Sequence, residues 1–244
     1  MKQSIFKIIE NKPLTSSVYQ MRLQGDTSDI TASGQFVNIA LSGKFLRRPI
    51  SVCDVEGDIL TLVYKVVGKG TAQMAEMQAG GELDILTGLG NGYDLSTAGK
   101  RPLLLGGGVG VPPLYNLAKR LIAGGAEVTV ILGFNKADEV FYKDEFEALG
   151  ANVIVATADG SMGVKGFVTD ALPGDYTYFY TCGPELMLKA VWRATVTSGQ
   201  LSFEERMGCG FGACMGCSCK TLTGYKRICK EGPVMRKEEI LWEK

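Results

Sequence analysis

The sequence predicts an antiparallel β-barrel, then an α/β unit with a parallel sheet, then a small C-terminal segment rich in cysteine. Three observations support this fold class. Segments rich in Val, Ile and Tyr follow one another with short connections through the first third of the chain. From residue 99 to residue 202, strand-like and helix-like segments alternate. Beyond that point the alternation stops, and a glycine-rich stretch carries Cys209, Cys214, Cys217 and Cys219.

The composition limits the function classes. The chain has 244 residues, of which 45% are hydrophobic and 21% charged, which is enough for two domains. Lys plus Arg equals Asp plus Glu at 26 each, so the charge predicts no nucleic-acid partner. The start lacks the apolar run of a signal peptide and no window suits a membrane span, so we expect a cytoplasmic protein with reduced thiols. The absence of histidine excludes Rieske ligation, histidine zinc sites and histidine general bases.

The first unit, residues 1–98, is expected to be the barrel. A turn at residues 55–58, which contains a glycine, joins two of its strands, and a short helix is expected at residues 71–77. Successive antiparallel strands with short connections are typical of a small barrel. The predicted strands cover residues 17–23, 35–41, 50–55, 59–67 and 82–89.

The second unit, residues 99–202, is expected to be an α/β domain. Leu114, Leu117, Ala118 and Leu121 recur at helical spacing and predict one apolar helix face. Because strands and helices alternate, the strands should form a parallel sheet. The predicted strands are 101–105, 127–134, 152–158 and 176–182, and the predicted helices are 114–125, 143–149, 168–172 and 185–196.

The third segment, residues 203–244, carries the most specific motif. Cys209, Cys214 and Cys217 read C-x4-C-x2-C, and Cys229 follows downstream. This is the plant-type ferredoxin spacing for a [2Fe-2S] cluster, which needs four thiolates. Such a loop must turn sharply around a compact core and aim N–H groups at sulfur. Glycines at positions 208, 210, 212 and 216 would allow the positive φ angles that this requires.

Other readings of these cysteines stay open. A structural zinc site usually has two C-x2-C units, and only Cys214 to Cys217 supplies one. A disulfide is disfavoured in a reducing compartment. Cys219 lies too close to Cys217 for the strict pattern, so we leave it out of the ligand set. We expect Cys229→Ser to lose the cluster and Cys219→Ser to keep it.

Two further stretches predict a nucleotide at the edge of the parallel sheet. Residues 106–110, Gly-Gly-Gly-Val-Gly, follow a strand and open a helix, where backbone N–H groups can bind phosphate. The stretch departs from the Rossmann fingerprint at Pro113 and lacks the acidic residue of the next strand end, so a plain packing turn is the alternative. Cys182-Gly183-Pro184 ends another strand and should line the same crevice. Cys182 could otherwise be a small buried hydrophobic residue.

The barrel contains two polar stretches of its own. Arg47 and Arg48 precede Pro49-Ile50-Ser51, and two adjacent arginines are costly to bury unless an anion pairs with them. Residues 68–71, Gly-Lys-Gly-Thr, precede a short helix and resemble a phosphate cradle. Either stretch alone could be a solvated turn. Together, beside a nucleotide-type sheet, they predict a second nucleotide cofactor.

These motifs together resemble a known superfamily. R-P-x-S, G-x-G-T, G-G-G-x-G-x-x-P and C-G-P, in this order, are similar to the ferredoxin–NADP reductase superfamily. The E-R-M-x-C-G-x-G-A-C-x-x-C run and the C-x-x-G-P-V ending are similar to the family of dihydroorotate dehydrogenase B electron-transfer subunits. The resemblance covers nearly the whole chain, and its cysteine segment is the most specific part.

The resemblance implies an FAD-binding barrel, an NAD-binding α/β domain and a [2Fe-2S] segment, with no catalytic side chain of the chain's own. Arg48 is expected at the FAD pyrophosphate and Ser51 near flavin N5. Ile50 replaces the usual aromatic residue, and Lys65 replaces a more familiar arginine. The implied FAD contacts are Arg48, Pro49, Ile50, Ser51, Val63, Tyr64, Lys65, Gly70 and Thr71. The implied NAD contacts are Gly106, Gly107, Gly108, Gly110, Cys182, Gly183 and Pro184, and the implied cluster ligands are Cys209, Cys214, Cys217 and Cys229.

The resemblance also implies a partner. An FMN-containing dihydroorotate dehydrogenase catalytic subunit would oxidise dihydroorotate in a heterotetramer with two copies of each chain. Electrons would pass from its FMN through [2Fe-2S] and FAD to NAD+. The stretch Phe134-Asn135-Lys136 offers one lysine and no arginine for a 2′-phosphate, so NAD is expected rather than NADP. The alternatives are an NAD(P)H-oxidising reductase subunit that feeds another redox partner, and a colourless zinc-stabilised binding protein.

Overall fold

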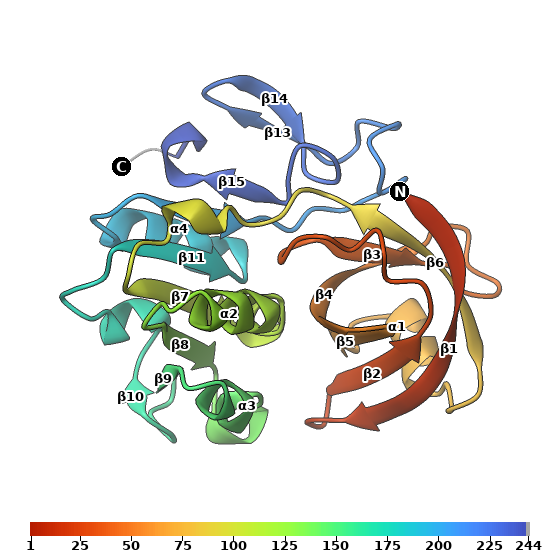
Figure 1. Ribbon diagram of the computed structural model, residues 1–244, viewed down its shortest axis with the longest axis horizontal. Helices are drawn as coiled ribbons and strands as arrows, with labels where there is room; N and C mark the ends of the chain where they lie inside the picture. The colour runs from red at the N-terminus through yellow and green to blue at the C-terminus, as the bar shows by residue number, and fades with distance from the viewer. Residues whose placement is uncertain (243–244) are drawn as a thin grey trace.

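The computed structural model describes residues 1–242 and has a barrel beside a sheet-and-helix unit, with the C-terminal segment lying across both (Figure 1). Six antiparallel strands close the barrel in the order β1-β2-β5-β4-β3-β6. The predicted barrel is therefore confirmed. Its elements are β1 (Lys2–Pro13), β2 (Val18–Gln24), β3 (Phe36–Ile39), β4 (Arg48–Glu56), β5 (Ile59–Lys65), helix α1 (Lys69–Ala75) and β6 (Glu82–Leu89).

The sequence analysis missed strand β1. In its middle, Phe6 and Ile8 are buried and alternate with exposed residues, which is the period of two of a half-buried strand. The strand pairs with β2 on one side and with β6 on the other, so it closes the barrel. The predicted turn at residues 55–58 is present, with φ of +59° at Gly57, where glycine avoids the Cβ clash.

The second unit is a seven-stranded sheet in the order β10-β9-β8-β7-β11-β12-β15. Its first six strands are parallel, which confirms the predicted α/β sheet, and β15 is antiparallel to β12. The short β12, with the sequence Gly-Gln-Leu-Ser, was not predicted. The strands are β7 (Pro102–Gly107), β8 (Thr129–Phe134), β9 (Asn152–Thr157), β10 (Val164–Lys165), β11 (Tyr178–Cys182), β12 (Gly199–Ser202) and β15 (Val234–Arg236). The helices are α2 (Pro113–Ala123), α3 (Lys143–Ala148) and α4 (Glu185–Ala194).

The barrel and the sheet unit share a packed interface. Helix α2 lies against β4, where Lys119 pairs with the buried Asp54 at 2.9 Å. Asn116 donates to the same carboxylate at 2.7 Å and accepts a hydrogen bond from Ser33 at 2.6 Å. One apolar cluster also joins Val63 of the barrel to residues of α2. The two units therefore hold a defined relative position.

The C-terminal segment has little core of its own. The hairpin β13 (Ser218–Thr221) and β14 (Gly224–Arg227) projects from the rest of the chain (Figure 1). Buried Cys217, Ile228 and Cys229 pack on Phe36, Leu86 and Leu89 of the barrel. Strand β15 completes the neighbouring sheet. The segment thus depends on both units for burial.

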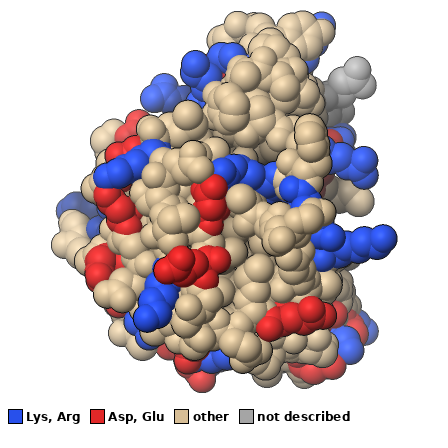
Figure 2. All heavy atoms as spheres, turned by 90° about the vertical axis from the view of Figure 1, so that its right-hand side faces the viewer, with Lys and Arg blue, Asp and Glu red and all other residues tan. Residues whose placement is uncertain are grey.

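Two surface features complete the description. Basic and acidic side chains are interspersed on the barrel side of the molecule, in keeping with their equal numbers (Figure 2). Among residues 1–242, no helix has the length and apolar character needed to cross a membrane.

Candidate cofactor site

The four predicted cluster cysteines lie in two pairs. Cys209 Sγ accepts hydrogen bonds from the N–H groups of Ala213 at 3.2 Å and Cys214 at 3.4 Å, and it interacts with the Cys214 thiol. Partial burial opposes ionisation of Cys209, but the N–H groups of Cys214, Phe211 and Ala213 outweigh it and hold its pKa at about 6. The first pair is half-buried at Cys209 and exposed at Cys214.

The second pair is buried. Cys217 Sγ accepts a hydrogen bond from the N–H of Cys229 at 3.4 Å, and the two thiols interact. Both residues are only 2% exposed. Burial and the neighbouring Cys217 raise the pKa of Cys229 to about 12. This pair faces the barrel, whereas Cys214 of the first pair faces outward.

The two-by-two arrangement fits a two-iron cluster. A [2Fe-2S] cluster with four cysteine ligands spreads them over two metal centres, whereas a zinc site gathers four ligands around one ion. The pairing of Cys209 with Cys214 and of Cys217 with Cys229 therefore fits the iron–sulfur interpretation.

The prediction of positive φ angles holds for two of the four loop glycines. Gly210 and Gly212 do have positive φ, at +79° and +94°, but Gly208 and Gly216 do not. A Cβ at Gly208 or Gly216 would lie 3.3 or 3.5 Å from Cys214 Sγ, so these glycines leave room beside the sulfur. The remaining left-handed position of the loop is Met215, at φ +60°.

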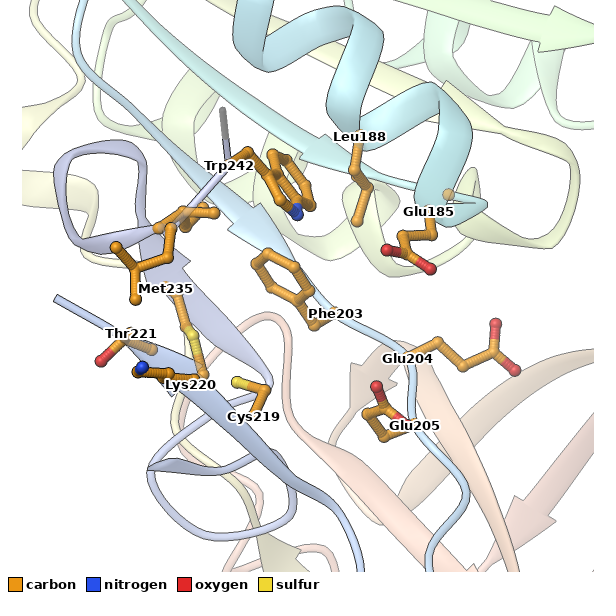
Figure 3. Close-up of a pocket in the computed structure, with 13 residues that line it drawn as sticks. Glu185, Leu188, Phe203, Glu204, Glu205, Cys219, Lys220, Thr221, Met235 and Trp242 are labelled. Atoms are coloured by element: carbon orange, nitrogen blue, oxygen red, sulfur yellow. The ribbon is translucent and has the colours of Figure 1, made fainter. Parts of the chain in front are cut away.

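Cys219, which the prediction left out, belongs to neither pair. It lines a pocket between the start of α4 and the C-terminal segment, together with Glu204, Glu205 and Trp242 (Figure 3). Burial and the charge of Glu205 raise the pKa of its thiol.

The predicted flavin segments flank the point where the ladder between β4 and β5 ends, which we call the opening between these strands. The β4–β5 ladder runs from Glu56 opposite Ile59 to Val52 opposite Leu62, and no further pair follows. Residues 48–51 pair with β3 instead, and residues 63–65 pair with β2. Residues 48–51 and 63–65 are therefore not paired with each other across β4 and β5. These are the two stretches that the sequence predicts as flavin contacts.

The two arginines before β4 have different partners. Arg47 donates to both carboxylate oxygens of Asp84 at 3.0 Å and is therefore paired inside the protein. Arg48 has no acidic partner among residues 1–242, and its guanidinium bonds only to backbone carbonyls of the preceding residues. A Cβ at Gly70 would lie 2.2 Å from Arg48 Nε, so Gly70 is needed for this close approach.

Several predicted FAD contacts are engaged elsewhere through their side chains. The Thr71 hydroxyl accepts hydrogen bonds from the N–H groups of Val67 and Gly68 and so shapes the turn before α1. Tyr64 is 2% exposed and donates to Asn11 at 3.0 Å inside the barrel. Ile50 packs against the barrel core. The remaining predicted contacts, Pro49, Ser51, Val63 and Lys65, lie on the two stretches that flank the opening.

The two nucleotide loops of the sheet lie side by side. Gly106 of β7 is in register with Cys182 of β11. A Cβ at Gly110 would lie 2.2 Å from the Cys182 carbonyl oxygen and 2.6 Å from the Gly183 nitrogen. Nothing lies within 4 Å of a Cβ at Gly108, which has φ +52° and faces open space. Gly107 and Pro184 complete the same edge.

The groups near the end of β8 bear on the choice of dinucleotide. Lys136 Nζ pairs with Asp138 at 2.8 Å, and Asn135 donates to Glu139 at 2.9 Å. The hydrogen bond that Lys136 donates to Asp138 raises the pKa of Lys136 and keeps it charged. Since its charge is already matched by a carboxylate, this lysine is poorly suited to a 2′-phosphate.

Sequence reasoning missed two asparagines that hold the cluster segment. Asn38 of β3 donates to the carbonyl of Cys209 at 3.1 Å. Asn91 donates to the carbonyls of Glu231 at 3.0 Å and Val234 at 2.8 Å, and accepts from the Val234 N–H at 3.0 Å. Their partners lie 140 or more residues away in the chain, and no local pattern marks them.

Two family models match the chain. Residues 204–241 match the iron–sulfur cluster binding domain of dihydroorotate dehydrogenase B. Residues 104–193 match the oxidoreductase NAD-binding domain. A solved structure with a TM-score of 0.87 and 30% identity covers 97% of this chain and 90% of its own, and its name describes an NADH-dependent reduced ferredoxin-NADP oxidoreductase. A ferredoxin NADP+ reductase from Neisseria gonorrhoeae shares the fold at a TM-score of 0.70 and 21% identity, covering 80% of this chain and 90% of its own.

Curated relatives match over almost the full length. The chain is 42% identical to the dihydroorotate dehydrogenase B (NAD(+)) electron transfer subunit of Geobacillus sp., over 99% of each chain. It is 41% identical to the subunit of that name from Fusobacterium nucleatum, over 98% of this chain and 99% of the relative. At this identity and coverage, the chain belongs to the family of dihydroorotate dehydrogenase B electron transfer subunits.

Proposed function

We propose that this chain connects a dihydroorotate-oxidising partner to NAD+, as the name of its relatives describes. The observation that carries the proposal is the placement of two cysteine pairs between an exposed surface and the barrel. Cys214 faces outward, and the pair Cys217 and Cys229 packs on Phe36 of β3. A one-electron centre held here would lie between a docked partner and the barrel.

The four cysteines would hold the [2Fe-2S] cluster, two to each iron. When bound, the cluster carries single electrons and FAD pairs them for two-electron transfer to NAD+. The chain's own residues hold and insulate these groups. The backbone N–H groups of Ala213 and Cys229 donate to the sulfurs of Cys209 and Cys217. Burial of Cys217 and Cys229 keeps water from the inner pair.

FAD would bind at the opening between β4 and β5. Arg48 supplies a positive charge without an acidic partner, which suits a pyrophosphate, and Gly70 lets it lie close to α1. Backbone groups of residues 48–51 and 63–65 are free to meet the flavin from two sides. Tyr64 and Thr71 would contribute by shaping this opening, since their side chains already have partners.

NAD would bind along the joined ends of β7 and β11. Gly108 leaves space for close approach of a phosphate, and Gly110 lets the two loops touch. Cys182 lies at the end of β11, and burial raises the pKa of its thiol to about 12, so it stays neutral beside the nucleotide. The Lys136–Asp138 pair favours NAD over NADP.

The partner would be an FMN-containing dihydroorotate dehydrogenase catalytic subunit in the cytoplasm, with two copies of each chain in a heterotetramer. The exposed apolar residues Phe211 and Met215 flank Cys214 and would offer the partner subunit a docking surface. In Figure 2 the top of the molecule shows an uncharged area bordered by basic side chains, which suits such a contact. The three cofactor regions would correspond to residues 1–98, 99–202 and 203–244.

The test uses the chain alone and with its partner. The purified chain should be yellow-brown, contain iron and flavin, and pass electrons from NADH to artificial dyes. It should form no orotate from dihydroorotate until the catalytic subunit is added. Orotate formation by the chain alone would contradict the two-subunit proposal. Zinc in place of iron would contradict the cluster, and co-purification with a different redox partner would favour the reductase alternative.

A further inference from the structure

One side chain of the barrel reaches directly to a cluster cysteine. Asn38 lies in the middle of β3, is 1% exposed, and donates from Nδ2 to the carbonyl oxygen of Cys209 at 3.1 Å. Its own backbone carbonyl accepts a hydrogen bond from Arg47 at 3.3 Å, and Arg47 is held by Asp84. The donor is therefore rigidly anchored in the barrel wall.

The other half of this amide has no partner. Asn38 Oδ1 is buried and makes no hydrogen bond within residues 1–242. A buried carbonyl without a partner destabilises a fold, and an apolar residue of similar size would avoid that loss. Stability alone therefore does not explain an asparagine here. The Nδ2 group, which donates to the Cys209 carbonyl, is the part of the side chain that accounts for an asparagine at this position.

The loop is shaped to meet this amide closely. A Cβ at Gly210 would lie 2.3 Å from Asn38 Nδ2, so only glycine lets the backbone come this near. Gly210 also has φ of +79°, which turns the chain immediately after the ligand Cys209. Both partners of the contact are thus specialised for it.

Asn38 also belongs to the ladder of the proposed flavin segment. It is paired with Pro49 across the β3–β4 ladder, and its neighbour Val37 is paired with Ile50. One short path therefore runs from the Cys209 carbonyl through the Asn38 side chain and backbone to residues 48–51. Within residues 1–242, no other hydrogen bond of Asn38 reaches the cluster loop.

We propose that Asn38 is a positioning residue that fixes the iron–sulfur loop at a set spacing from the flavin-binding strand. The inference rests on the proposed function, and it adds a role for a residue outside both cofactor-contact sets. Without the Asn38 donor, the Cys209 carbonyl loses its hydrogen bond to the barrel, and the loop keeps its own turn and the hydrogen bond from Arg227 to the Gly212 carbonyl. The cluster then samples more than one position relative to the barrel.

The test replaces the amide with an apolar side chain of similar size. Asn38→Leu removes the donor and the unpartnered Oδ1 together, and Asn38→Ala serves if leucine disturbs folding. Thr87→Val is the matched control, because Thr87 is also fully buried in the barrel and its hydroxyl bonds to Lys2 rather than to the cluster loop. All variants are purified as the full chain with cofactors bound.

We expect Asn38→Leu to fold, to keep its iron and flavin, and to reduce dyes from NADH at the wild-type rate. Iron release to a chelator should accelerate by about tenfold, the upper end of what one net hydrogen bond can change in a docked-to-undocked equilibrium. The electron paramagnetic resonance spectrum of the reduced cluster should broaden, and cluster reduction by NADH should slow. Thr87→Val should match the wild type in each measurement.

Unchanged iron release, spectrum and cluster reduction in both Asn38 variants would overturn the inference, since Asn38 would then be a core residue only. Wild-type protein that holds no iron would instead overturn the proposed function. The two failures are therefore distinguishable. A lowered Tm with an unchanged spectrum and unchanged iron release would also count against positioning, because it would indicate a structural role alone.

Discussion

Gly110→Ala tests whether the junction of the two nucleotide loops serves NAD. The added Cβ would lie 2.2 Å from the Cys182 carbonyl oxygen, 2.4 Å from its carbonyl carbon and 2.6 Å from the Gly183 nitrogen. All three atoms belong to backbone, so no side-chain rotation relieves the clash. To move from 2.2 Å to the 3.4 Å at which ordinary contact begins, the loops must separate by about 1.2 Å.

This separation sets the size of the effect. Overpacking of a tight interior typically costs about 1–3 kcal/mol. For a chain of this length, that lowers Tm by about 2–12 °C. A displacement of about 1 Å in a positioning element can reduce a rate by about 100-fold. We therefore expect kcat/KM for NADH to fall far more than the stability loss alone would suggest.

The assay follows NADH-dependent dye reduction, with iron and flavin content measured in parallel. Gly174→Ala is the control, because it lies in the same unit, has no positive φ, and would place its Cβ in open space. Gly110→Ala should retain iron and flavin but lose activity with NADH, whereas Gly174→Ala should resemble the wild type. Wild-type kcat/KM for NADH in a folded Gly110→Ala variant would refute the assignment of these loops to NAD.

Three further predictions address the cluster and the barrel. Cys229→Ser should lose iron and the cluster's share of the visible absorbance while Cys219→Ser keeps both, and the reverse result would reassign the ligands. Asn91→Ala removes three hydrogen bonds to the chain around Val234 and should cost about 2–3 kcal/mol in thermal unfolding, with earlier bleaching of the cluster; an unchanged Tm would contradict this. Asp84→Asn tests pH dependence: hydrogen bonding from Arg47 lowers the pKa of Asp84 below its ordinary 3.8, so the pair stabilises at neutral pH and this stability is lost as pH falls below about 4. The variant should be less stable than the wild type at pH 7 by about 1 kcal/mol, and its Tm should fall less steeply as the pH is lowered below about 4. A Tm–pH curve of the variant that runs parallel to that of the wild type would refute the pairing.

The sequence was informative where structure follows from local pattern. Strand β6 matches the predicted residues 82–89, because its β-branched and apolar residues are bounded by turn-forming glycines. The alternation of strands and helices identified the parallel sheet. Strand β1 was missed because its mixed composition of Lys, Glu and Asn obscured the alternation of Phe6 and Ile8. Strand β12 was missed because four residues are too few for a period to register.

The candidate site also has features that follow from local sequence and features that depend on the folded chain. The spacing of Cys209, Cys214 and Cys217 is local, so the sequence could indicate a cluster directly. Arg47 and Arg48 look equivalent in the sequence, yet only Arg47 has an acidic partner within residues 1–242. That difference depends on Asp84, which reaches Arg47 only after the barrel closes. Pairing across a closed barrel cannot be read from neighbouring residues.

The contacts of the third segment show why its boundaries alone do not define a working unit. Strand β15 hydrogen-bonds to β12 of the sheet, and the inner cysteine pair packs on β3 of the barrel. Asn38 and Asn91 then hold the two ends of the cysteine segment from outside it. The spacing between cluster and flavin is therefore set by contacts between segments rather than within one. Electron transfer depends on that spacing. Asn38 and Asn91, which help to set it, lie in parts of the chain whose own sequence carries no redox motif.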